Sequence, residues 1–138
     1  MKITLKRLDD AYHLEAENED GRKIETDGSP AIGGSNKGMR PMQLLLAAAG
    51  SCSSVDLISI LKKQKQELTN FEVEVTAERE KDKVPSLFTD VHVHYKLTGD
   101  LDDAKVSRAV DLSFYKYCSV VKILEKTAKV SSSYEIIK

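Results

Sequence analysis

The residues of this sequence best suited to chemistry are its two cysteines, Cys52 and Cys118. They lie 66 positions apart and lack the CxxC spacing that indicates a zinc site. If the fold brings them together, one thiol can be oxidised to a sulfenic acid and the other can convert that acid to a disulfide. The alternative is that both are small buried side chains, because free cysteine is among the most buried residue types.

The neighbours of each cysteine favour a chemical role. Cys52 lies in a run of small residues from Gly50 to Ser54, which leaves room for a small molecule to reach the sulfur. Cys118 follows an expected helix break at residues 115–117 and directly precedes a helical pattern. We therefore expect it near a helix N-terminus, where backbone N–H groups and the helix dipole lower the pKa of a thiol.

Other candidate motifs are weaker. His92 and His94 alternate along a strand pattern and share one face, but a metal site needs three or more ligands, so we expect an ordinary polar sheet face and no metal. The stretch from Gly33 to Gly38 is not followed by the GKS or GKT of a phosphate-binding loop. The serine cluster at residues 51–54 has no nucleophile-elbow pattern.

Composition and charge narrow the function classes. The chain has 138 residues, which is one domain by length. Its 21 basic and 22 acidic side chains give a formal net charge of -1, which argues against non-specific nucleic-acid binding. The longest apolar stretch, Leu44–Gly50, is far shorter than the roughly 20 residues of a membrane helix. The start of the chain lacks the apolar core of a signal peptide, so we expect a cytoplasmic protein without a membrane partner.

The elements that must position the cysteines follow from periodicity and turn signals. A strand meander is expected over residues 1–26, a glycine-rich loop of the kind that is often functional over 27–39, and a helical block over 41–66. Strands follow over 70–97, helices over 102–128 and a last strand over 130–137. The helical block is apolar on every side from Leu44 to Ala49, which predicts burial all round. The fold class is α+β in a single domain.

Two segments together resemble a known family. They are Arg40–Cys52, read as RPMQLLLAAAGSC, and Tyr117–Val120, read as YCSV. This pair resembles the OsmC/Ohr family, the osmotically inducible protein C and organic hydroperoxide resistance proteins, and is most like its OsmC-like branch. The resemblance implies an OsmC-like fold in which antiparallel sheets wrap around a long central cysteine-bearing helix. It also implies an intertwined homodimer with its sites at the subunit interface.

The resemblance implies a peroxiredoxin-like activity, the thiol-dependent reduction of hydroperoxides. Cys52 is then the peroxidatic thiolate and Cys118 the resolving cysteine, with an external dithiol as reductant and no bound cofactor. At the position where the family carries a glutamate this sequence has Met42, and the residue nearest to the family's arginine is Arg7. The expected pocket lining is Met42, Gln43, Leu46 and Ser53.

A second function of a different class remains open from the sequence. An apolar pocket around residues 44–49 at a dimer interface could hold a lipid-like or aromatic molecule without turnover. In that case the protein is a non-catalytic binding dimer and its cysteines stay reduced.

Overall fold

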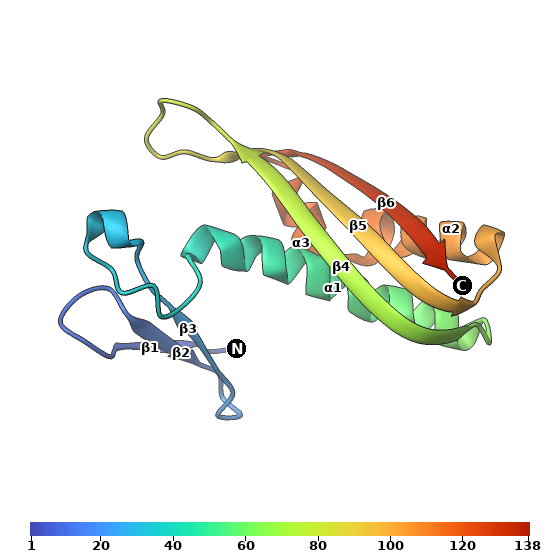
Figure 1. Ribbon diagram of the computed structural model, residues 1–138, viewed down its shortest axis with the longest axis horizontal. Coiled ribbons are helices and arrows are strands. Elements are labelled where there is room, and N and C mark those ends of the chain that lie inside the picture. Colours follow the sequence, from blue (N-terminus) through green and yellow to red (C-terminus); the bar gives the residue numbers. More distant parts are fainter. The chain divides into compact units, whose positions relative to one another are not determined.

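The computed structural model describes residues 1–138, and its elements follow in the order shown in Figure 1. The chain divides into two compact units, Met1–Leu45 and Leu46–Lys138. Both cysteines belong to the second unit.

The first unit contains an antiparallel meander of β1 (Thr4–Arg7), β2 (Leu14–Glu17) and β3 (Lys23–Thr26). The expected three strands are confirmed. Side chains fix both turns: the Arg7 guanidinium donates to the carbonyls of Asp10 and Ala11, and Asn18 Oδ1 accepts from the N–H groups of Asp20 and Arg22. Arg7 therefore closes the β1–β2 turn.

The glycine-rich loop after β3 is organised around one buried carboxylate. Asp27 accepts hydrogen bonds from the backbone N–H groups of Lys37 at 3.0 Å, Gly28 at 2.7 Å and Ser35 at 3.2 Å. These donors hold the pKa of Asp27 below its usual value, because they stabilise the charged form. The loop, which includes the short 3-10 helix η1 (Pro30–Ile32), thus uses its carboxylate to satisfy its own backbone.

The long helix α1 runs from Pro41 to Lys63, close to the expected bounds. Its buried residues are Ala49, Gly50, Ser53, Leu57 and Leu61. The prediction that residues 44–49 are buried on every side is wrong for the single chain, where Leu45 and Ala47 are exposed. Within one chain the core covers only one side of the helix.

The expectation that no segment is long and apolar enough to span a membrane is also wrong. α1 has 23 residues, and an 18-residue window of it has a mean hydropathy of 1.8, so length and composition alone would suffice. Counting only Leu44–Gly50 missed this, because the helix continues through the uncharged run of small residues around Cys52. Core helices of soluble proteins meet the same criterion.

The second unit contains a three-stranded sheet in the order β4 (Glu67–Arg79), β5 (Phe88–Asp100) and β6 (Lys129–Ile137). β4 and β5 are antiparallel, but β6 is parallel to β5, so the expected wholly antiparallel sheet is corrected to a mixed one. The reason lies in the connection after β5, which is long enough to return the chain in the same direction.

That connection consists of α2 (Asp103–Asp111), the π-helical segment η2 (Leu112–Tyr117) and α3 (Ser119–Leu124). The Asp102 side chain caps α2, since it accepts from the Lys105 N–H at 3.0 Å. The expected break before Cys118 takes the form of the π-helix. α3 ends earlier than expected, at Leu124.

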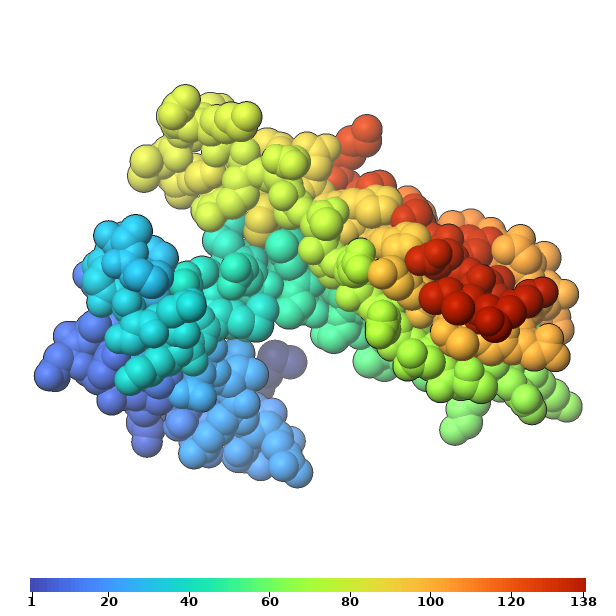
Figure 2. Space-filling view, in the orientation of Figure 1, coloured from blue at the N-terminus to red at the C-terminus, as the bar shows by residue number.

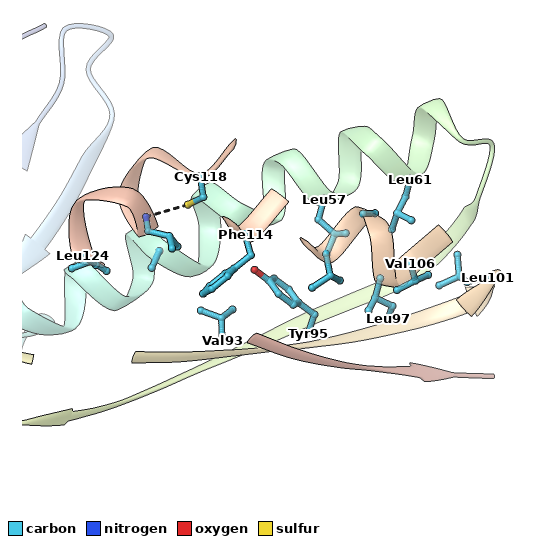
Figure 3. Close-up of a cluster of buried hydrophobic side chains, with 14 residues drawn as sticks. Leu57, Leu61, Val93, Tyr95, Leu97, Leu101, Val106, Phe114, Cys118 and Leu124 are labelled. Carbon is cyan, nitrogen blue, oxygen red and sulfur yellow. Dashed lines mark hydrogen bonds between the residues drawn. The ribbon is translucent and has the colours of Figure 1, made fainter. Parts of the chain in front are cut away.

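One face of the β4–β5–β6 sheet is covered and the other is open. The side chains labelled in Figure 3 fill the space between the strands and the helices of this unit, and the inward residues of β5 are Val91, Val93, Tyr95 and Leu97. The alternating residues His92, His94 and Lys96 point to the opposite face, as predicted. β5, in gold, and β6, in red, lie at the surface in Figure 2.

Candidate functional site

The structure brings Cys52 and Cys118 into one region of the second unit. Cys52 is half-buried on α1 and packs against the core cluster that contains Cys118. Cys118 is completely buried at the N-cap of α3, where its sulfur accepts the Val121 N–H at 3.4 Å (dashed line in Figure 3). Both are free thiols, so solvent reaches only the Cys52 side of the pair.

The electrostatics of Cys118 differ from the expectation. Burial raises the pKa of its thiol to about 11, the Val121 N–H acts in the opposite direction, and the Cys52 side chain adds to the rise. The predicted helix N-terminus is present, but the predicted lowering of the pKa is wrong, because removal from water outweighs the backbone N–H groups of Val121 and Val120. The Cys52 side chain packs against the core cluster that includes Cys118, so the two thiols share one region.

A buried hydroxyl pair lies next to the cysteines. The Tyr95 hydroxyl donates to Ser53 Oγ at 2.6 Å, and Ser53 Oγ in turn donates to the Ala49 carbonyl at 2.9 Å. Tyr95 and Ser53 are both fully buried. Burial raises the pKa of Tyr95 to about 12, and charge on either cysteine raises it further, so the hydroxyl lies within electrostatic reach of both sulfurs.

Sequence reasoning missed this hydroxyl pair. The signal was a tyrosine among the inward-facing residues of β5, because a tyrosine buried in an apolar core needs a partner for its hydroxyl. Ser53 was expected to line an open pocket, but it is buried and bonded to Tyr95, so that prediction is wrong.

The other expected lining residues lie near the start of α1. Met42 and Leu46 are half-buried, and Gln43 is exposed with its Oε1 accepting the Arg40 N–H at 2.9 Å. A hollow of about 370 Å³ lies between α1 and β4 in the second unit, and its lining is different: Ala47, Gly50, Ser51, Ser54, Phe71, Val73 and Val75.

Gly50 sets how closely α1 and β4 approach at this hollow. A Cβ at this position would lie 3.0 Å from Val75 Cγ2 and 3.6 Å from Val73 Cγ1. A larger residue would push the strand from the helix turn that precedes Cys52. The small residues around Cys52 thus have a packing role.

The two histidines singled out in the sequence lie on the open face of the sheet and not in the cysteine region. No group of three or more histidine, cysteine, aspartate or glutamate side chains is arranged to hold a metal ion in this structure. On the same sheet Glu74 pairs with Lys96 at 2.7 Å.

Comparison with known proteins gives the chain its family. The model of the family described as OsmC-like protein matches residues 34–133, which include both cysteines. The chain belongs to the OsmC family. Protein YhfA of Escherichia coli K12 is 44% identical over 122 residues, covering 88% of this chain and 87% of that protein. Membership supports a general redox role in peroxide stress for this chain, because the family includes hydroperoxide-reducing enzymes.

Solved structures agree on the OsmC fold. A hypothetical protein from Aquifex aeolicus superposes with a TM-score of 0.84 at 29% identity, over 99% of this chain and 95% of that one. The organic hydroperoxide resistance protein OhrB of Bacillus subtilis gives a TM-score of 0.64 at 22% identity, over 97% and 96% of the two chains. The second likeness shows the fold alone.

The difference in burial predicts unequal thiol reactivity. Iodoacetamide at pH 8 should label Cys52 of the reduced, folded protein and leave Cys118 unlabelled, because Cys118 is buried and its pKa is about 11. Peptide mass spectrometry measures both sites. Labelling in denaturant is the control, where both should react. Equal labelling of the two thiols in the folded protein would contradict the described burial.

The hydroxyl pair predicts a non-additive stability cycle. Ser53→Ala leaves the Tyr95 hydroxyl buried without an acceptor, which should cost about 1–3 kcal/mol. Adding Tyr95→Phe to that variant removes the stranded donor and should restore part of the loss. Free energies of unfolding from urea titrations test this for the unchanged protein, the two single variants and the double variant. Strictly additive effects would show that the two hydroxyls are not coupled.

Proposed function

We propose that this protein reduces organic hydroperoxides with Cys52 as the peroxidatic residue and Cys118 as the resolving residue. The observation that carries the proposal is the neighbouring pair of free thiols, of which only Cys52 is open to solvent. Membership of a family that includes hydroperoxide-reducing enzymes supports the same reaction class. The reaction belongs in a reducing compartment such as the cytoplasm, where dithiols are present.

The first step is the attack of the Cys52 thiolate on the terminal oxygen of the hydroperoxide. The O–O bond breaks, the alkoxide leaves with a proton as the alcohol, and Cys52 becomes a sulfenic acid. The sulfur is oxidised by two electrons and the peroxide is reduced by two. No metal or bound cofactor enters this balance.

The second step joins the two sulfurs. The Cys118 sulfur attacks the Cys52 sulfur, the S–OH bond breaks, and hydroxide leaves as water with the Cys118 proton. At neutral pH Cys118 carries that proton, because its pKa is about 11. An external dithiol then reduces the disulfide by thiol–disulfide exchange and returns both thiols.

The immediate partner in this proposal is a second copy of the chain. Each unit leaves apolar side chains exposed, such as Ile3, Leu5 and Ile24 around the first sheet and Val55, Ile58 and Ile123 in the second unit. Only 28% of the apolar window of α1 is buried within one chain. A homodimer would cover such surface, and exposed apolar surface of this extent is typical of an association site.

A second candidate function rests on the apolar hollow beside α1. Its side chains from β4 and the small residues of α1 would suit a small apolar molecule held without turnover. This alternative predicts that the hollow binds a ligand while the thiols remain reduced in the presence of peroxide.

The peroxidase proposal predicts a defined set of products. Without reductant, the protein should convert about one equivalent of cumene hydroperoxide per subunit to the alcohol and form a Cys52–Cys118 disulfide. Cys52→Ser should abolish both, Cys118→Ser should stop at a dimedone-reactive sulfenic acid, and Ser51→Ala is the matched control. Disulfide formation should accelerate as pH rises toward 11, because more Cys118 is thiolate.

The outcome also separates the two functions. If Cys52→Ser consumes peroxide as fast as the unchanged protein, the peroxidase proposal fails. The binding function would be established instead by two results together. The thiols would stay reduced after peroxide treatment, and a small apolar molecule would displace an apolar fluorophore from the hollow.

The dimer proposal is tested by mass in solution. Sedimentation equilibrium at micromolar concentration should give twice the chain mass of 15.4 kDa. Val55→Glu places a charge on an exposed apolar position of α1 and should weaken the association, whereas the already polar Ser59→Glu serves as the control. A mass of one chain at all concentrations would overturn the dimer.

A further inference from the structure

The open face of the β4–β5–β6 sheet carries a continuous row of hydrogen-bonded side chains from β5 and β6. His92 Nδ1 lies 2.7 Å from Ser131 Oγ, and His92 Nε2 lies 2.7 Å from Ser133 Oγ. His94 Nδ1 lies 2.7 Å from the same Ser133 Oγ, and His94 Nε2 lies 3.3 Å from Glu135 Oε1. The parallel pairing of β5 with β6 sets His92 beside Ser131 and His94 beside Ser133.

The chemistry of the end groups fixes the direction of this row. The Glu135 carboxylate can only accept, so His94 Nε2 carries a hydrogen and His94 Nδ1 accepts from the Ser133 hydroxyl. Ser133 has then used its one hydrogen, so its oxygen accepts from His92 Nε2–H. His92 Nδ1 is therefore unprotonated and accepts from the Ser131 hydroxyl. The Glu135 carboxylate thus determines the tautomers of both His92 and His94.

This direction makes His92 a base for Ser131. If Ser131 releases its proton to His92 Nδ1, His92 can pass its Nε2 proton to Ser133, and Ser133 can pass its own to His94. The positive charge then lies on His94, next to the Glu135 carboxylate, which stabilises it. The row thus moves the charge away from Ser131.

Ser131 and His92 also line a hollow. It measures about 280 Å³ and is formed by residues of β4, β5 and β6, among them Thr76 and the carboxylates of Glu78 and Asp90. The carboxylates repel anions, so the hollow suits neutral or cationic molecules. β6 is the edge strand, and its outward N–H groups have no strand partner in the sheet and can donate to a carbonyl oxygen.

We propose that Ser131 is a nucleophile for acyl transfer from neutral or cationic esters, with His92 as its general base. Ser131 Oγ attacks the ester carbonyl carbon and its proton goes to His92 Nδ1. The C–O bond to the alcohol group breaks, and that group leaves with the proton from His92. Water then hydrolyses the acyl-Ser131 ester by the same base and releases the acid. Ser133, His94 and Glu135 are positioning residues that hold the tautomers and receive the charge.

This activity uses neither cysteine, so its test is independent of the peroxidase proposal. The probe is p-nitrophenyl acetate at pH 7.5 on the full-length protein. After a short exposure, trypsin cleavage at Lys129 releases the peptide 130–138, which contains Ser131, Ser132 and Ser133 but no cysteine or histidine. Fragment ions locate the acetyl group among the three serines, of which Ser132 has no imidazole partner.

Acetylation is expected on Ser131 and not on Ser132. His92→Gln should lower its rate on the order of 100-fold by removing the general base. Glu135→Gln keeps an acceptor for His94 but removes the charge, so its rate should fall between those of His92→Gln and the unchanged protein. Glu72→Gln, on β4 of the same sheet and outside the row, is the matched control and should not change the rate. Circular dichroism confirms that each variant is folded.

Two results would overturn the proposal. The first is equal acetylation of Ser131 and Ser132, which would show that the base adds nothing. The second is a rate at Ser131 that is the same in the unchanged protein and in the folded Glu135→Gln variant, which would show that the row does not act as one unit.

Discussion

The structure of the second unit depends on the close approach of α1 to the sheet. Two contacts fix it: Gly50, where any side chain would meet Val75, and Ser53, which receives the Tyr95 hydroxyl at 2.6 Å. The first contact limits the separation, and the second sets the register of the helix along β5. Cys52 lies between these two positions on the helix, so its place beside the core follows from them.

Cys118 reaches the same region by a different route. The π-helical turn and the short α3 place it at a helix N-cap, and the core packed around it excludes water. Burial destabilises the charged thiolate and therefore raises the pKa of Cys118. The two thiols therefore divide their roles by environment, one reachable from outside and one held as a protonated partner. This asymmetry suits a pair in which one sulfur meets the oxidant and the other meets the first sulfur.

The mixed sheet provides two separate chemical surfaces. Alternation along β5 directs Val93 and Tyr95 into the core beside the cysteines, and directs His92 and His94 to the open face. Because β6 runs parallel to β5, every second residue of its serine run lies next to one of these histidines. A single strand thus supports the buried thiol region and the exposed hydrogen-bonded row without contact between them.

The sequence by itself determined most of the strands and helices, the shared outward face of the two histidines and the choice of Cys52 and Cys118 as candidate reactive residues. These follow from local periodicity and capping chemistry, which depend on neighbours within a few residues. Tertiary structure alone decided the parallel pairing of β6, the burial of Ser53 against Tyr95 and the high pKa of Cys118. Each of these depends on residues distant in the chain, and desolvation in particular is set by everything packed around a group. For the same reason the helix N-terminus predicted for Cys118 was correct while its electrostatic consequence was not.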